Sequence, residues 1–371
     1  RKGGLRFIDP AIGTGSFFSA VRSIFPTGRL SHAAGIELDP EFVRATRALW
    51  ESYGLEVTEG DFTQQIPPAT KYDLLIANPP YVRHHHLNSA DKTRLNALLA
   101  ERLGMSISGL AGLYCYFLLL ADSWLAEKAL SVWLIPSEFM DVNYGNTVKH
   151  YLLDNVTLLH IHRFCPSDVQ FVDALVSSAV VVFEKTPPKQ GHAVEFTFGG
   201  SLNQPELTEL VDLGTLRGAR KWTAFPASNL AERRTPSITL GDLFDVKRGL
   251  ATGNNAFFVL PLERAKALGI PSQYLRPIVP SPRYMRESVI EGDEEGHVRL
   301  DRQLALIDCP LGEDTVRVKY PEFWSYLEQG KAEGVHKGYL ASRRVPWYSQ
   351  EKREPAPFLC TYMGRSKERP F

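Results

Sequence analysis

Residues 7–15, Phe-Ile-Asp-Pro-Ala-Ile-Gly-Thr-Gly, decide the fold class of this chain. They complete an apolar run, Leu5–Asp9, that reads as a buried strand, and a helical pattern begins directly after them. Glycines between a strand and a helix let the backbone turn tightly and approach a ligand closely. The spacing from Asp9 to Gly15 is Asp-x-x-x-Gly-x-Gly, whereas dinucleotide folds carry GxGxxG. An acid before the glycines would repel a pyrophosphate and attract a cationic ligand. The alternative is a turn whose glycines serve packing only.

The next segment adds a second ligand-binding candidate. S-adenosylmethionine has a cationic amino-acid end that fits an acid such as Asp9, and its ribose needs a partner. Residues 33–39 read as a strand ending in acid, with Glu37 placed 22 positions after Gly15 to accept two hydrogen bonds from a ribose diol. Asp39-Pro40 is a typical helix cap and first residue, so we assign Asp39 to capping and Glu37 to the ligand. A helical stripe follows, with apolar residues at 42, 45, 49 and 53.

A third predicted strand, residues 55–58, leads to Asp61 and Phe62. The Asp61 carboxylate is placed to accept a hydrogen bond from an adenine amine, and the Phe62 backbone is placed to meet the ring. An aspartate after a glycine is also a common turn former, and this is the structural alternative.

A fourth strand, Tyr72–Ala77, is followed by Asn78-Pro79-Pro80-Tyr81. Two prolines stop both ladder pairing and helix formation, which leaves Asn78 and Tyr81 on a stiff loop at the carboxyl end of the strand. An amide acceptor, exposed carbonyls and an aromatic ring suit a flat base with an exocyclic amine. Ordinary strand-to-loop punctuation is the alternative. The four polar loops converge on one edge of a doubly wound α/β sheet, which the alternatives do not explain.

Composition sets the broad class. The chain has 371 residues, 44% of them hydrophobic and 23% charged, as in a globular protein with two domains. No apolar run is long enough to span a membrane, and no signal peptide is visible. The four cysteines are scattered and form no CxxC, which indicates neither a zinc site nor disulfides and predicts a cytoplasmic location. Three consecutive histidines, His84–His86, cannot all face one metal, so no metal site is expected.

Residues 7–17 together with Asn78–Tyr81 resemble the S-adenosylmethionine-dependent DNA adenine amino-methyltransferases. The motif order resembles their gamma class, with the TaqI-like enzymes of restriction–modification systems as the nearest group, and the resemblance covers residues 1–185. It implies a class I methyltransferase fold, a Rossmann-like doubly wound mixed sheet. It also implies S-adenosylmethionine as cofactor and double-stranded DNA as partner. A restriction endonuclease, separate or fused outside this chain, is left open.

The resemblance extends the candidate site. In the family, Leu38 and Phe117 would cover the two faces of the cofactor adenine, Phe117 lying in a predicted helix, Leu110–Lys128. Phe171 would line the target-base pocket opposite Tyr81. Core packing is the alternative for these apolar residues. The expected cofactor-binding residues are Asp9, Ala11, Gly13, Gly15, Glu37, Leu38, Asp61, Phe62, Asn78 and Phe117. The expected catalytic residues are Asn78, Pro79, Pro80, Tyr81 and Phe171.

The second half differs from the first in charge and composition. Residues 1–185 hold 16 basic and 19 acidic side chains, whereas residues 186–371 hold 26 and 23. We expect a catalytic domain over 1–185, a linker over 186–235, and a mixed α/β target-recognition domain over 236–371. The phrase 246–259, with a basic pair and Gly-Asn-Asn, suits DNA contact or a plain hairpin turn. Candidate phosphate contacts are Arg217, Arg220, Lys221, Arg233, Arg234, Arg283, Arg286, Arg343 and Arg344.

Three alternatives stay open. The tetrapeptide 78–81 also resembles that of protein-glutamine N5-methyltransferases, although a recognition region rich in arginine favours DNA. Cytosine N4 is another target, but enzymes acting on it more often carry serine in the place of Asn78. The chain begins almost at its first strand and ends just after an apolar one, so we expect a fragment, with incomplete DNA recognition. An idle DNA-binding specificity module is the alternative from another class.

Overall fold

A computed structural model describes residues 4–26, 28–165, 177–189, 191–227, 238, 240–279, 288–294, 296–299 and 303–360. The chain divides into two compact units, residues 1–236 and 237–371. This division lies at the predicted start of the second domain. Each unit is described by itself.

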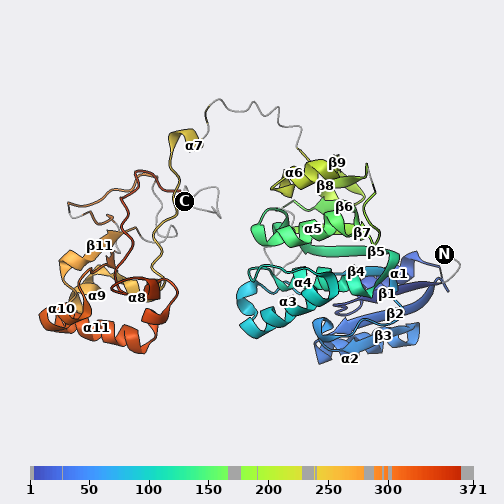
Figure 1. Cartoon of the computed structure of the whole chain (residues 1–371), viewed down its shortest axis with the longest axis horizontal. Coiled ribbons are helices and arrows are strands. Elements are labelled where there is room, and N and C mark those ends of the chain that lie inside the picture. Colours follow the sequence, from blue (N-terminus) through green and yellow to red (C-terminus); the bar gives the residue numbers. More distant parts are fainter. Residues whose placement is uncertain are drawn as a thin grey trace. The chain divides into compact units, whose positions relative to one another are not determined.

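The first unit is built on a nine-stranded sheet in the order β3-β2-β1-β4-β5-β7-β6-β8-β9, which can be followed upward in Figure 1. Parallel pairing joins β1 to β2 and β4, β2 to β3, and β4 to β5, whereas β7 runs antiparallel between β5 and β6. The strands are β1 Leu5–Asp9, β2 Leu30–Glu37, β3 Leu55–Glu59, β4 Tyr72–Ala77, β5 Leu125–Pro136, β6 Thr157–Arg163, β7 Ser178–Glu184, β8 Ala193–Ser201 and β9 Gln204–Asp212.

The direction of strand order reverses between β1 and β4, which pair side by side with Phe7 opposite Leu74. In open α/β sheets this switch point leaves a crevice at the carboxyl ends of the strands, where ligands bind. The loops after β1 and β4 carry the glycine motif and the Asn78–Tyr81 motif. The topology therefore brings the two predicted motifs to the same crevice.

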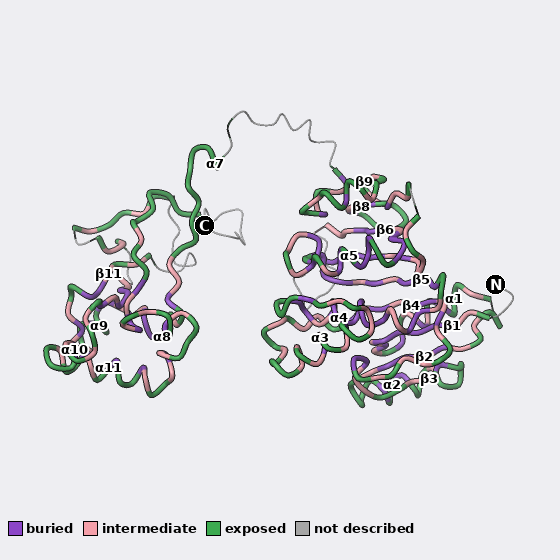
Figure 2. Tube along the Cα trace, in the orientation of Figure 1, coloured by how far each residue is buried: buried purple, intermediate pink, exposed green. Residues whose placement is uncertain are grey.

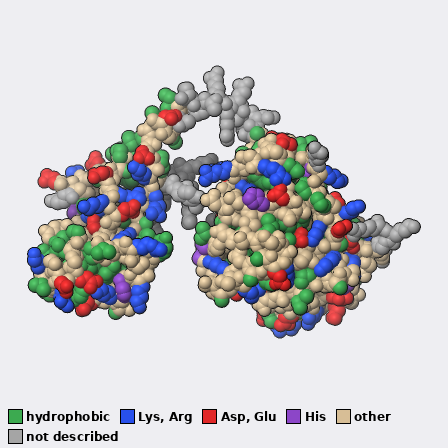
Figure 3. Space-filling view, in the orientation of Figure 1, with side chains coloured by type: hydrophobic (Ala, Val, Ile, Leu, Met, Phe, Trp, Pro, Cys, Tyr) green, Lys and Arg blue, Asp and Glu red, His purple; other side chains and the backbone are tan. Residues whose placement is uncertain are grey.

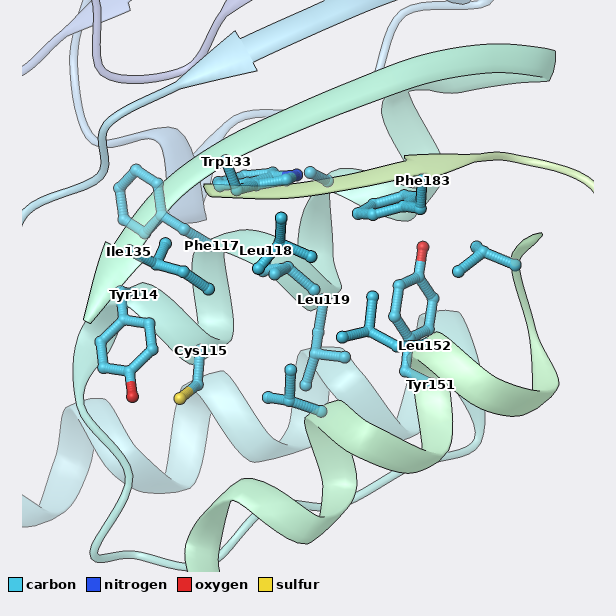
Figure 4. Close-up of a cluster of buried hydrophobic side chains, with 14 of the residues drawn as sticks. Tyr114, Cys115, Phe117, Leu118, Leu119, Trp133, Ile135, Tyr151, Leu152 and Phe183 are labelled. Carbon is cyan, nitrogen blue, oxygen red and sulfur yellow. The ribbon is translucent and has the colours of Figure 1, made fainter. Parts of the chain in front are cut away.

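Helices pack on the sheet and bury its core. They are α1 Ser16–Ile24, α2 Pro40–Trp50, α3 Ser89–Leu103, α4 Leu113–Leu120, α5 Asn146–Asp154 and α6 Leu213–Gly218. Helix α4 is apolar all round, and every residue from Tyr114 to Leu120 is buried. Figure 4 shows its side chains packed against Trp133 and Ile135 of β5 and against Tyr151 of α5. Helix α4 is therefore part of the core of the first unit.

The predicted helix Leu110–Lys128 is wrong in its second half. The α-helix ends at Leu120, a 3₁₀ turn covers Ala121–Trp124, and β5 begins at Leu125. Pairing decides the difference, because Leu125 and Leu130 lie opposite Tyr72 and Leu74 of β4. The apolar pattern alone did not separate the end of a buried helix from the start of a buried strand.

The predicted stripe on α2 faces solvent. Phe42, Leu49 and Tyr53 are 48%, 51% and 56% exposed. The buried residues of this helix are Val43 and Thr46, which share its inward side. The expected helix is therefore present and is capped by Asp39 as predicted, but its core-facing side was misassigned.

The segment 186–235 was predicted to be a linker, and this is wrong for its described part. Strands β8 and β9 extend the sheet beyond β6, with Phe196 of β8 opposite Glu209 of β9. Phe196 and Trp222 are fully buried and belong to the main core. Pro187 and Pro188 mark only the turn between β7 and β8. The hydrophobic partners of the β8–β9 hairpin are far away in sequence.

The second unit has a three-stranded antiparallel sheet in the order β10-β12-β11. A stacked pair, Phe257 and Tyr326, with ring centroids 4.6 Å apart, lies in its core together with Trp347. Its elements are α7 Leu240–Leu243, α8 Asn255–Phe258, β10 Val259–Pro261, α9 Leu262–Ala267, β11 Leu275–Ile278, β12 Leu304–Ile307, α10 Glu313–Lys319 and α11 Pro321–Ala332. Figure 2 shows buried stretches of this unit near α8, α9 and β11. Within the described ranges, no helix has the length and apolar content to cross a membrane.

Candidate active site

The glycine loop after β1 turns through two residues in the left-handed region, Gly13 with φ 52° and Gly15 with φ 84°. The Gly15 N–H donates to the carbonyl of Ile12, 2.9 Å away, which closes the turn at the start of α1. A β-carbon at Gly13 would meet no atom within 4 Å, so open space lies in front of the loop. A ligand can therefore approach the Gly13 backbone directly.

Glu37, at the end of β2, holds this loop with its carboxylate. Its Oε2 accepts from the Gly13 N–H at 2.9 Å, and its Oε1 accepts from the Asp39 N–H at 2.9 Å. Each oxygen keeps a second lone pair. The side chain is half-buried, so these positions suit the two hydroxyls of a ribose. The predicted pairing of Glu37 with a diol is geometrically available.

Asp9 lies at the base of the same loop and is buried. Its Oδ1 accepts from the Ala11 N–H at 3.0 Å. Burial raises the pKa of Asp9 from 3.8 to about 7, the Ala11 hydrogen bond opposes this, and the nearby charge of Glu37 adds to it. A cationic ligand group beside Asp9 would lower that pKa and favour the carboxylate.

Two residues that support the loop were not predicted from the sequence. Thr46 of α2 is fully buried, and its hydroxyl donates to the Gly13 carbonyl. The Trp50 indole N–H donates to the Thr14 carbonyl at 2.8 Å. The spacing of Val43, Thr46 and Trp50, three and four residues apart, is the helical signal that marks this inward face.

The predicted adenine-binding residues divide into exposed and buried ones. Leu38 is 69% exposed beside the ribose candidate Glu37, which suits an open apolar contact for a ring. Phe62 and Phe117 are buried, with ring centroids 5.0 Å apart. Asp61 accepts from the Thr63 N–H and hydroxyl, both at 2.8 Å, and so caps the turn Phe62–Gln64. Direct contacts of Asp61, Phe62 and Phe117 with a cofactor stay predictions.

The Asn78–Tyr81 loop contains one buried acceptor without a partner. Among the described residues, nothing hydrogen bonds to the Asn78 side-chain oxygen. Pro79 is buried beside it and Pro80 is exposed. The Tyr81 hydroxyl donates to the Leu134 carbonyl at 3.0 Å, Ser178 also hydrogen bonds to this hydroxyl, and burial raises the pKa of Tyr81. The Tyr81 ring is thereby anchored at its far end, while Asn78 keeps its acceptor free.

Two further predictions concern this edge of the sheet. Phe171, the expected second face of the base pocket, lies outside the described residues. The histidines form a single 3₁₀ turn, His84–His86, after the loop. No group of three or more His, Cys, Asp or Glu in the described part of the chain is placed to hold a metal ion.

Comparison with known proteins relates most of the chain to a family. The profile of the Eco57I restriction-modification methylase matches residues 40–171, and that of the C-terminal domain of the type II methyltransferase M.Eco57I matches residues 226–369. The chain belongs to the restriction–modification methyltransferases. S-adenosylmethionine is its cofactor, as the sequence predicted. The space before Gly13 and the lone pairs of Glu37 fit that cofactor.

Relatives of this restriction–modification methyltransferase extend over most of the chain. The type II methyltransferase M.XamI of Xanthomonas campestris pv. amaranthicola is 28% identical over 368 residues, and M.AccI of Acinetobacter calcoaceticus is 26% identical over 373. Each comparison covers 97% of this chain and 67% of the relative. The chain therefore spans about two thirds of the length of these relatives.

Solved structures support the fold. The type IIL restriction-modification enzyme MmeI, in complex with DNA, matches with a TM-score of 0.59 at 12% identity, covering 94% of this chain and 51% of that chain. The type IIG restriction endonuclease BpuSI matches with a TM-score of 0.50 at 16% identity, covering 95% and 44%. The class I methyltransferase fold predicted for this restriction–modification methyltransferase is confirmed.

Proposed function

We propose that this chain transfers a methyl group to the exocyclic N6 of adenine in duplex DNA at a specific sequence. The observation that carries this proposal is the Asn78 side-chain oxygen, a buried acceptor without a partner among the described residues. An unpaired buried acceptor costs about 1–3 kcal/mol, so a donor from the substrate is expected to satisfy it. An amine hydrogen is such a donor.

The Asn78–Tyr81 loop supplies the acceptors for this reaction. The Asn78 oxygen and the Pro79 carbonyl accept from the two amine hydrogens, which directs the nitrogen lone pair away from the ring plane. When bound, S-adenosylmethionine supplies a methyl group on a sulfonium, and the new N–C bond forms as the S–C bond breaks. The methylated amine would release one proton to water, and the sulfur would keep the electron pair of the broken S–C bond as a neutral thioether. Positioning and hydrogen bonding supply the catalysis, without a covalent enzyme intermediate.

Tyr81 is proposed to stack on the target base. Adenine N6 is buried in the duplex, so the base must be flipped out before reaction. The hydrogen bond from the Tyr81 hydroxyl to the Leu134 carbonyl fixes one end of the ring and reduces the entropy lost on stacking. Phe171 is proposed for the opposite face of the base. The second unit is proposed to recognise the DNA sequence, and a restriction endonuclease is proposed as a partner or as a further part of the whole protein.

The test is methyl incorporation from tritiated S-adenosylmethionine into unmethylated bacterial duplex DNA, followed by nucleoside analysis. Label in N6-methyladenosine is the expected result. Label in N4-methylcytosine would instead identify the exocyclic amine of cytosine as the target. Salt-dependent duplex binding without label would indicate an idle specificity module, because phosphate contacts alone give that salt dependence. Label in protein glutamine without label in DNA would overturn the DNA assignment.

A further inference from the structure

The second unit holds a candidate base-reading arginine that is distinct from its neighbour. Arg343 and Arg344 are adjacent in sequence and both suited phosphate contact on sequence grounds. The structure gives them different surroundings. Arg344 is directed into the unit, whereas Arg343 is exposed at the surface.

Both terminal nitrogens of the Arg344 guanidinium donate to acceptors inside the unit. One guanidinium nitrogen donates to the Thr252 carbonyl and to the Gln350 side-chain oxygen, both at 2.9 Å, and the other donates to the Ala251 carbonyl at 2.6 Å. Gln350 is held in turn by Asp308, whose Oδ1 accepts from the Gln350 N–H at 2.8 Å. Arg344 therefore ties the loop 339–346 to the glycine-rich phrase that contains Thr252, and it is not available for phosphate.

Arg343 lies over an exposed aromatic ring. Its guanidinium carbon is 3.6 Å from the ring centroid of Tyr339, and one nitrogen donates to the Tyr339 carbonyl at 2.8 Å. Tyr339 is 72% exposed, and Val345, two residues beyond Arg343, is 98% exposed. Among the described residues, Arg343 has no ion-pair partner within 4.0 Å, whereas Arg217 pairs with Asp154 and Arg317 pairs with Asp314. Arg343 thus presents free N–H donors in a fixed orientation.

A fixed orientation favours a directional contact. A phosphate can be contacted by the point charge of a lysine, whereas lysine does not replace an arginine that is stacked or makes a bidentate contact. A guanidinium held by a ring and a carbonyl has already lost side-chain freedom, so its remaining donors suit the paired acceptors O6 and N7 of guanine. Figure 3 shows both basic and acidic side chains on one face of this unit.

We propose that Arg343, stacked on Tyr339, reads a guanine in the DNA site, and that Arg344 is a positioning residue that holds its loop. The proposal rests on the proposed function, because it takes duplex DNA as the substrate. The exposed Val345 is an apolar side chain beside the reader, of the kind that contacts a thymine methyl group.

The test separates reading from binding and from catalysis. A library of random duplexes is bound to the full chain at fixed salt, and the retained DNA is sequenced for the parent, Arg343→Ala, Arg343→Lys and Arg317→Ala. The parent is expected to enrich a motif that contains a guanine. Arg343→Ala and Arg343→Lys should each lower the preference for that guanine about tenfold or more and leave the other positions unchanged. Arg317 is an exposed arginine on α10, and the control variant Arg317→Ala should enrich the same motif as the parent.

Several results would overturn this role. They are a parent motif without guanine, no enrichment by the parent, or an unchanged motif in both Arg343 variants. Uniform weakening by Arg343→Ala that Arg343→Lys restores would mean a phosphate contact and would also overturn it. Methyl incorporation is measured separately on the same DNA. Guanine-dependent enrichment without methylation would therefore contradict the proposed function and leave the reader role in place.

Discussion

The Oε2 atom of Glu37 lies 2.9 Å from the backbone nitrogen of Gly13. A side chain at the end of β2 thereby fixes the loop that follows β1. The same carboxylate is the proposed ribose acceptor, so loop geometry and cofactor binding depend on one group. The Asp39 N–H, which donates to the other oxygen, links it to the start of α2.

Glu37→Gln should weaken S-adenosylmethionine binding about tenfold or more. The amide replaces one acceptor oxygen by a donor, which then faces the Gly13 or Asp39 N–H instead of accepting from it. Isothermal titration calorimetry with the cofactor measures the change. Glu41→Gln, in the first turn of α2 and exposed, is the matched control and should keep the parent affinity. Equal affinity of Glu37→Gln and the parent would exclude the ribose role.

Asn78→Ala should abolish methyl transfer and leave cofactor affinity unchanged. The substitution removes the side-chain acceptor proposed for the amine and leaves in place the Asp9, Gly13 and Glu37 groups proposed for the cofactor. Methyl incorporation and calorimetric titration are measured on the same preparation. Asn203→Ala, in the exposed turn between β8 and β9, is the control and should keep full activity. Methylation by Asn78→Ala near the parent rate would remove Asn78 from the mechanism.

Gly15→Ala should lower both stability and cofactor affinity. Its φ of 84° is unfavourable for alanine, and the added β-carbon would lie 2.6 Å from the indole ring of Trp50. Gly54→Ala is a close control, because φ is 85° there but no atom lies within 4 Å of the new β-carbon. Both variants should lose about 1 kcal/mol to backbone strain, and only Gly15→Ala should lose more. Denaturant unfolding measures both, and equal losses would contradict the steric argument.

Asp9→Asn should change the pH dependence of stability. Burial raises the pKa of Asp9 from 3.8 to about 7. At a pH between these two values, the folded chain therefore keeps a proton on Asp9 that the unfolded chain has lost. The contribution of Asp9 is therefore complete below about pH 4 and is lost as the pH rises toward 7. Between pH 5 and pH 8 the free energy of unfolding should fall more for the parent than for Asp9→Asn. Asp39→Asn, at the exposed cap of α2, should behave like the parent.

The strands that carry the site were predictable from sequence. Strands β1 and β4 begin and end where the apolar runs predict, because each is buried and bounded by Pro10 or by Pro79. The cap at Asp39 followed from local chemistry alone. The convergence of the loops after β1 and β4 followed from one topological rule, since carboxyl ends of parallel strands share an edge.

The remaining features depend on contacts that a local pattern does not contain. The apolar residues of α2 that form the clearer stripe, Phe42 and Leu49, face solvent, while Thr46 turns inward to reach the Gly13 carbonyl. A buried polar residue with a distant backbone partner interrupts the apolar pattern by which the inward face of a helix is predicted. The extension of the sheet by β8 and β9 was not predicted, because β8 pairs with β6 across more than 30 residues of sequence, and β9 joins the sheet only through β8.

The unsatisfied side-chain oxygen of Asn78 has a consequence for the thermal stability of the fold. The catalytic unit carries a desolvated acceptor that contributes nothing to the resting protein. Selection for a high melting temperature alone would therefore favour apolar residues at this position, and the resulting chain would lack the acceptor proposed for the target amine. Thermostable forms of the enzyme are expected to gain their stability elsewhere, with this weak point retained in each of them.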